Sequence, residues 1–242
     1  MKVIFFIVIL LFTSSIYSQI NEKNAIDSDL VTFQNRLKTN ELNKSDWEEI
    51  WNKTISLIKI RNFEKAKEYA NKAKLLATYL NNDLLIARSW HLIGKSYMSL
   101  GPYNKTAIDA FSMSLNTYGK VGKTPESRKW AGYMANDLSF LYIDPQYSKT
   151  HPDIKAAMVL LSNVYQSNVK YESVDKKELE VLTAINIGNA FYQSGHIISQ
   201  LVFLENALSI YEKHSAIIDN YFYFLINFRM QKVYRRLGEY EK

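Results

Sequence analysis

Trp90-His91-Leu92-Ile93-Gly94-Lys95-Ser96-Tyr97 is the stretch that decides the fold, together with Ala107-Ile108-Asp109-Ala110-Phe111 a short distance downstream. Trp90, Ile93 and Tyr97 recur at i, i+3 and i+7, the spacing that brings side chains onto one face of a helix. Both stretches are free of proline and rich in residues that tolerate a helix. The first stretch therefore predicts an amphipathic helix with an aromatic face.

A second helix is predicted directly after a break in the first. Gly94 lies inside the first helical pattern, where glycine costs about 1 kcal/mol relative to alanine. Such a glycine indicates the close approach of another helix. Gly101-Pro102 ends the first helix, because the residue before proline disfavours the helical conformation. Ala107, Phe111 and Leu115 then recur every four residues, so we expect the small alanine to let the helices close while Phe111 fills the gap.

The pattern W-x2-[L/I]-G-x2-Y, followed by A-x3-F, resembles one tetratricopeptide repeat, a unit of two antiparallel helices. The resemblance covers about residues 46–242 and is strongest at residues 86–118. It implies an all-α fold, namely a right-handed superhelical α-solenoid of antiparallel helix pairs. It also implies a scaffold whose usual task is to hold another molecule.

Looser copies of the motif recur along the chain. The glycine position is occupied in turn by Thr54, Gly94, Ser139, Gly188 and Gln231, at intervals of 40, 45, 49 and 43 residues. A standard repeat has about 34 residues, so each unit carries about two extra helical turns or a longer loop. A degenerate all-α solenoid is the alternative.

The repeat array is expected to occupy residues 46–242, and its first helix is expected at Asp46–Ile60 with a cap at its start. Residues 19–45 are expected to form an N-terminal capping region, with a helix over residues 26–40. A solenoid needs such a cap, since its end repeat would otherwise expose an apolar face. Residues 144–152 are the clearest loop.

The N-terminus has the order of a secretory signal peptide. Lys2 precedes the apolar run Val3–Phe12, and small residues follow up to Ser18; this order is typical of a cleaved export signal. The run is too short to span a bilayer, which takes about 20 residues, although an uncleaved anchor is the alternative. We exclude residues 1–18 from the fold and expect export to the periplasmic or extracellular face of the envelope.

The other end of the chain stops inside a predicted turn, at residues 238–242. The preceding helix has no second helix after it, although it carries the large apolar residues Phe222, Leu225, Ile226, Phe228 and Val233. Burying each such side chain contributes about 1.5–3 kcal/mol. We expect the natural protein to continue beyond residue 242, with a membrane anchor downstream as one continuation, and the open last repeat to promote self-association.

No catalytic constellation is recognisable, so we expect a protein that is not an enzyme and that takes no cofactor or metal. The chain has no cysteine and its four histidines lack metal-ligand spacing. Gly94-Lys95-Ser96 and Gly122-Lys123-Thr124 lack the first glycine of a phosphate-binding loop. Carboxylates such as Glu48, Glu49, Glu178 and Glu180 are expected on solvated faces.

The net charge of +6 permits an acidic partner without selecting one. A basic cluster gathers on the last predicted helix: Arg229, Lys232, Arg235 and Arg236. We attribute it to favourable charge near a helix C-terminus and to solvation. Nucleic-acid binding is the alternative, and the predicted export signal argues against it.

Repeats of this kind line a concave groove with the first helix of each unit. The resemblance places a set of polar residues in that groove: Arg88, His91, Lys95, Asn136, Asn189, Tyr192, Lys232 and Arg236. Amide and cationic groups can hold a peptide backbone or a carboxylate. The lysine–asparagine carboxylate clamp of chaperone-binding relatives is not reproduced in register, and ordinary solvation is the alternative for each position.

We therefore predict a non-catalytic scaffold that binds a protein or peptide ligand outside the cytoplasm. The exported array also resembles the sensor half of bacterial envelope regulators. The first alternative is accordingly the input module of a membrane-anchored signal-transduction regulator, with a kinase or DNA-binding output beyond residue 242. The second alternative is the repeat platform of an exported enzyme.

Overall fold

The structure is a computed structural model that describes residues 32–33, 35–39, 41–98, 105–121, 124–144, 153–168 and 174–238. Within these ranges all regular secondary structure is helical and no strand occurs. The chain divides between Asp46 and Trp47 into two compact units. The helices in chain order are α2 (Lys44–Lys59), α3 (Phe63–Tyr79), α4 (Asp83–Met98), α5 (Lys105–Val121), α6 (Pro125–Ile143), α7 (Ile154–Asn168), α8 (Val174–Gln193), α9 (Ile197–His214) and α10 (Asn220–Leu237).

The first unit contains a short helical stretch and the start of α2. Residues 32–33 and 35–38 are helical, within the predicted helix at residues 26–40, and its Phe33 and Leu37 are buried. Helix α2 begins two residues before the predicted Asp46, because Asn43 caps it: Asn43 Oδ1 accepts the Ser45 N–H at 2.7 Å. The predicted signal peptide at residues 1–18 lies outside the described residues.

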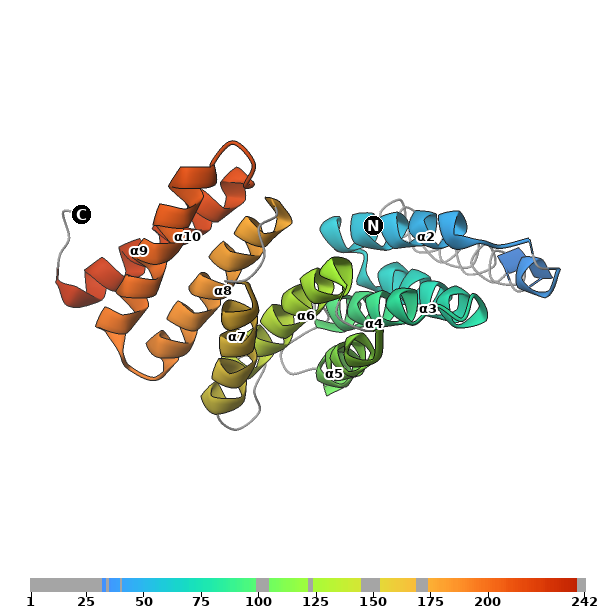
Figure 1. Cartoon of the computed structure of the whole chain (residues 1–242), viewed down its shortest axis with the longest axis horizontal. Helices are drawn as coiled ribbons and strands as arrows, with labels where there is room; N and C mark the ends of the chain where they lie inside the picture. The colour runs from blue at the N-terminus through green and yellow to red at the C-terminus, as the bar shows by residue number, and fades with distance from the viewer. Residues whose placement is uncertain are drawn as a thin grey trace, which may run out of the picture. The chain divides into compact units, whose positions relative to one another are not determined.

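In the second unit, each helix from α3 to α10 packs against the next one along the chain. Figure 1 shows α8, α9 and α10 in one group, in which α9 packs against both α8 and α10. Alternate helices also touch, since α4 contacts α6, α6 contacts α8, and α8 contacts α10. This arrangement is compatible with a helical repeat, and it brings α4, α6, α8 and α10 together along one side of the unit.

The hairpin of α4 and α5 is closed by a glycine beneath an aromatic ring, as the sequence predicts. A Cβ atom added at Gly94 would meet Phe111 Cδ1 at 2.2 Å. Phe111 and Ala107 are fully buried, and Ser114 Oγ donates to the Ala87 carbonyl across the helices at 2.6 Å. The expected turn at Gly101-Pro102 lies outside the described residues.

The five glycine-position residues lie on α2, α4, α6, α8 and α10, one on each alternate helix. Thr54, Gly94, Ser139 and Gly188 are buried, whereas Gln231 is exposed. No described helix covers Gln231, because α9 packs on a different face of α10. Of the predicted loop at residues 144–152, the structure describes Asp144, which follows the end of α6, and residues 145–152 lie outside it.

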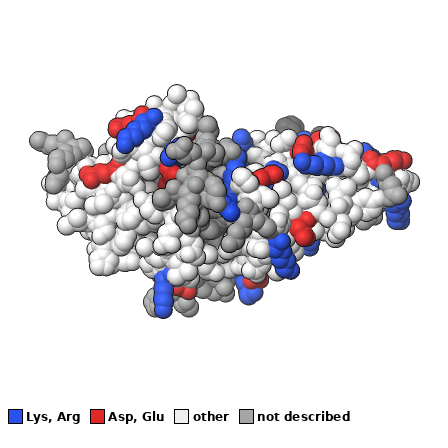
Figure 2. Space-filling view, in the orientation of Figure 1, with Lys and Arg blue, Asp and Glu red and all other residues white. Residues whose placement is uncertain are grey.

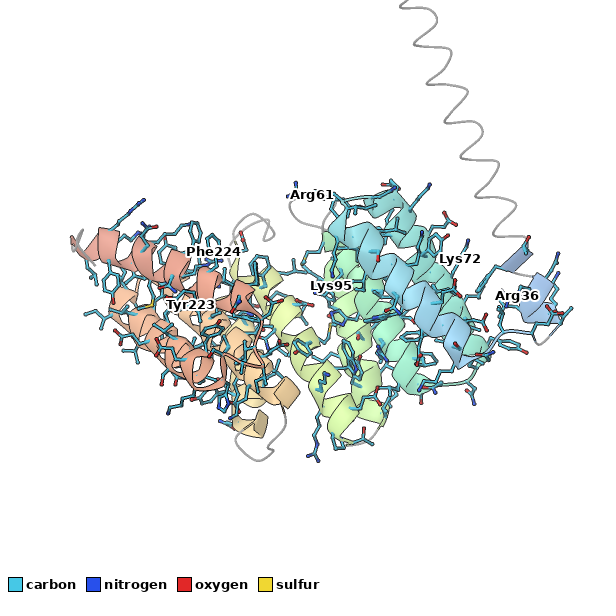
Figure 3. The ribbon with its side chains drawn as sticks, turned by 90° about the horizontal axis from the view of Figure 1, so that it is seen from above. Arg36, Arg61, Lys72, Lys95, Tyr223 and Phe224 are labelled. Carbon is cyan, nitrogen blue, oxygen red and sulfur yellow. The ribbon has the colours of Figure 1, made fainter. Side chains whose placement is uncertain are left out.

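Helix α10 is better packed than its sequence suggested. Ile226, Met230 and Val233 are buried in a cluster with residues of α8 and α9, so the expectation that this helix lacks a partner is wrong for that face. Another face stays open, where Phe224 is 68% exposed and its ring stacks on that of Phe228. Phe224 is labelled in Figure 3. The C-terminal residues 239–242 lie outside the described residues.

We expect Gly94→Ala to destabilise the protein, because the added methyl group would collide with a ring that has no space to move. Overpacking of this kind costs about 1–3 kcal/mol, which outweighs the gain of about 1 kcal/mol in helix propensity. Gly119 in α5 is the matched control, since it is exposed and has nothing within 4 Å of an added Cβ. Gly119→Ala should stabilise by about 0.5–1 kcal/mol. Urea unfolding followed by circular dichroism measures both, and equal shifts would contradict the close approach.

Candidate functional site

Side chains from α2, α4, α6, α8 and α10 enclose a groove of about 780 Å³ in the second unit. Its apolar wall is rich in aromatic rings: Trp51, Ile55, Leu92, Trp130, Tyr133, Phe140, Leu182, Ile185, Tyr221, Phe222 and Leu225. Its polar lining groups are His91, Lys95, Lys129, Asn136, Asp137, Glu178, Asn186, Asn189 and Arg229. A concave, mostly apolar surface with a few convergent polar groups is the usual form of a ligand site.

Three tryptophans at one end of the groove surround the guanidinium group of Arg88. The Arg88 Cζ atom lies 4.7 Å from the ring centroid of Trp47, 4.5 Å from that of Trp51 and 4.4 Å from that of Trp130. Trp51 and Trp130 meet edge to face at 5.4 Å. Burial lowers the pKa of Arg88, while Glu126, at 3.8 Å, favours its charge. Cation–π attraction therefore ties α2, α4 and α6 together at this point.

The centre of the groove holds a histidine, a carboxylate and a lysine. His91 Nε2 and Lys95 Nζ lie 2.7 Å and 3.2 Å from Asp137 Oδ2; Lys95 is labelled in Figure 3. Burial lowers the pKa of His91 below its ordinary 6.5, so we assign a neutral ring that donates from Nε2. Burial opposes the charge of Asp137, but Lys95 and His91 together outweigh it and hold the pKa of Asp137 at about 2.

A series of buried amide and hydroxyl groups joins α6 to α8. Asn136 Nδ2 donates to Gly132 O and to Thr183 Oγ1, both at 3.0 Å. Asn186 Nδ2 donates to Asn136 Oδ1 at 2.9 Å, and Thr183 Oγ1 donates to Leu179 O at 2.6 Å. Each of these side chains thus has its hydrogen-bond partner one turn away on its own helix or on the neighbouring helix. The bonds between the helices specify how α6 and α8 face each other.

Some buried polar atoms of the groove residues have no hydrogen-bond partner among the described residues. They are His91 Nδ1, Asn189 Oδ1 and Arg229 Nε. His91 is 3% exposed and Asn189 is 6% exposed, so bulk water does not replace the missing partners. An unpaired buried group costs about 1–3 kcal/mol, and native proteins keep few of them without a functional reason.

The structure brings four of the eight predicted groove residues together, namely His91, Lys95, Asn136 and Asn189. The other four, Arg88, Tyr192, Lys232 and Arg236, do not line this groove. Arg88 lies among the three tryptophans, Arg236 Cζ lies 4.4 Å from the Tyr192 ring centroid, and Lys232 Nζ lies 4.4 Å from that of Phe228.

Other groove residues were not predicted. Glu178 is half-buried and lines the groove, and Glu180 is half-buried and pairs with Lys177 at 3.0 Å. Arg229 was assigned to a solvated cluster, but it too faces the groove. Trp51 and Trp130 belong to helical apolar patterns. Such a pattern predicts that a side chain is buried, but it does not distinguish the wall of a groove from the core.

The described residues lining the groove include no serine, threonine or cysteine. No group of three or more histidine, cysteine or acidic side chains in the described ranges could hold a metal ion. None of the described helices has the length and apolar character required to cross a bilayer. On the face drawn in Figure 2, lysines and arginines are interspersed with acidic residues, as on an ordinary solvated surface.

Neither protein-family models nor curated proteins provide a match for this sequence. The geometry of the groove is therefore the basis for assigning a function.

We expect acid to destabilise the protein in two stages. Folding lowers the pKa of His91. The contribution of His91 to the free energy of unfolding is therefore complete above pH 6.5 and is lost as the pH falls below that value. The pKa of Asp137 falls from 3.8 to about 2, so its contribution of about 2 kcal/mol is lost between those values. Urea denaturation at a series of pH values measures both stages.

Two variants separate the stages of this acid effect. Asp137→Asn should abolish the lower stage, and it should lower stability at pH 7 because His91 and Lys95 lose their charged partner. His91→Gln should abolish the stage that begins near pH 6.5. An unchanged pH profile in both variants would show that these groups do not titrate in the way the geometry indicates.

Proposed function

We propose that this protein is a non-catalytic scaffold that binds an extended peptide segment in the groove between its alternate helices. The proposal includes the right-handed superhelical solenoid of tetratricopeptide type that the Trp90–Phe111 motif resembles. It is supported by the order of the helices, in which each packs on the next and alternate helices share one side. The N-terminal pattern at residues 1–18 supports a location outside the cytoplasm.

The observation that carries the proposal is the presence of unpaired buried acceptors in an aromatic groove. His91 Nδ1 and Asn189 Oδ1 both require a donor, and a neutral His91 offers a lone pair at Nδ1. A peptide supplies a backbone N–H at almost every residue. Its apolar side chains would contact Trp51, Trp130 and the other rings of the wall, where aromatic side chains contribute most of the binding energy of an interface.

The size of the groove also favours a short segment. About 780 Å³ lies within the range of about 300–1,000 Å³ that is typical of pockets for small ligands. An extended stretch of a few residues matches both the volume and the mixture of apolar and hydrogen-bonding groups.

We expect Asn189→Leu to weaken peptide binding while leaving the fold as stable as before or more so. Leucine has nearly the same shape and removes a buried acceptor that has no partner in the free protein. Losing that hydrogen bond to a ligand should reduce affinity about tenfold or more. The assay is selection of a phage-displayed random dodecapeptide library on the whole chain, followed by fluorescence titration of the selected peptides.

Gln200→Met is the matched control. Gln200 Oε1 is also buried without a partner, but Gln200 lies on α9 and does not line the groove. This variant should be equally stable and should bind the selected peptides like the unchanged protein. Selected peptides that bind Asn189→Leu with undiminished affinity would refute the groove as their site.

A further inference from the structure

The charged side chains that line the groove differ in whether they have a partner of opposite charge or a hydrogen-bond donor. Three cations and two acids contribute to the lining: Lys95, Lys129, Arg229, Asp137 and Glu178. Both acids already have partners. Asp137 is bound by His91 and Lys95, and Glu178 accepts from the Tyr133 hydroxyl at 3.4 Å. The net charge of the lining side chains is therefore positive, and both of their carboxylates already have hydrogen-bond or ion-pair partners.

Arg229 is the cation whose partner is missing. It lies on α10 and is half-buried, and its Nε atom has neither solvent contact nor a hydrogen-bond partner among the described residues. It forms no ion pair with a described residue. The neighbouring cations of α10 differ in this respect, because Lys232 and Arg236 lie over aromatic rings. A partly buried cation without a counter-charge is stabilised when a ligand supplies an anionic partner.

The groups that line the groove restrict which ligand can pair with Arg229. Arginine presents a planar fork of donors that matches a carboxylate. Asn189 lines the same groove and offers an unpaired acceptor. The complementary ligand therefore has an anionic oxygen pair for Arg229 and an N–H donor for Asn189. An aspartate or glutamate within a peptide has both, the carboxylate in its side chain and the N–H in the backbone.

We infer that the peptide bound in the groove is acidic and that an internal Asp or Glu side chain of the peptide pairs with Arg229. This inference rests on the proposed peptide-binding function and specifies its ligand class. The apolar wall next to Arg229 includes Phe222 and Leu225 from the same helix. The preferred segment accordingly combines an acidic residue with large apolar neighbours.

Library selection with matched variants tests this inference. The random dodecapeptide library is selected on the whole chain, on Arg229→Gln and on Arg235→Gln. Arg235 is exposed on the same helix and does not line the groove, so its variant changes the net charge equally. We expect Asp and Glu to be enriched among the peptides selected on the unchanged chain and on Arg235→Gln, and this enrichment to disappear on Arg229→Gln.

A double-mutant cycle with synthetic peptides then locates the contact. A selected peptide with acetylated and amidated ends is compared with its Glu→Gln form. Either this change or Arg229→Gln should reduce affinity about tenfold, and the two together should cost little more than one alone. Arg229→Lys keeps the charge and loses the planar fork, so its affinity for the Glu peptide should lie between that of the unchanged chain and that of Arg229→Gln. It replaces Arg229→Gln in the cycle if that variant does not fold.

The outcomes separate this inference from the proposed function. Binding that depends on Asn189 but tolerates both Glu→Gln and Arg229→Gln would overturn the acidic ligand and leave the peptide groove intact. Tighter binding of a phosphoserine peptide than of the Glu peptide would overturn the carboxylate in favour of a phosphorylated ligand. Failure of the library to yield any peptide sensitive to Asn189→Leu would overturn the proposed function itself.

Discussion

Buried polar contacts between alternate helices are the constraint on which the rest of this structure depends. The bond from His91 to Asp137 joins α4 to α6, and the bond from Asn136 to Thr183 joins α6 to α8. A polar group that loses its partner in such a place costs about 1–3 kcal/mol. Apolar packing alone tolerates some rotation of a helix, whereas these bonds permit little. They thereby specify which side chains face the groove.

The same groove contains polar atoms that have no hydrogen-bond partner in the part of the chain that the structure describes. Asn189 Oδ1 and Arg229 Nε are two of them, whereas the amide and hydroxyl groups between α6 and α8 are paired. Proteins commonly sacrifice some stability where a binding site must stay open for its ligand. Arg88 has different surroundings, because three tryptophan rings lie around its guanidinium group.

Much of the local structure could be predicted from the sequence, and much of the site could not. The close approach of α4 and α5 follows from Gly94 and Phe111, whose spacing is a local property of each helix. The groove set was predicted by projecting one repeat onto the others, and this placed Tyr192 and Arg236 in the lining. In the structure these two side chains lie against each other. Projection between repeats fails where the intervals are irregular, because an insertion that is not a whole number of helical turns changes the direction in which each residue points.

The sequence by itself determined the helices, their order along the chain and the residues that let neighbours close together, because periodicity and glycine position act within a few turns. Only the tertiary structure decided which charges meet and which remain without a partner. Asp137 and His91 are separated by 46 residues, and Arg229 reaches the groove from the last described helix. Such relations depend on the rotation and offset of helices that are distant in the chain. No local pattern encodes those two quantities, and they emerge when the buried groups of all the helices are satisfied together.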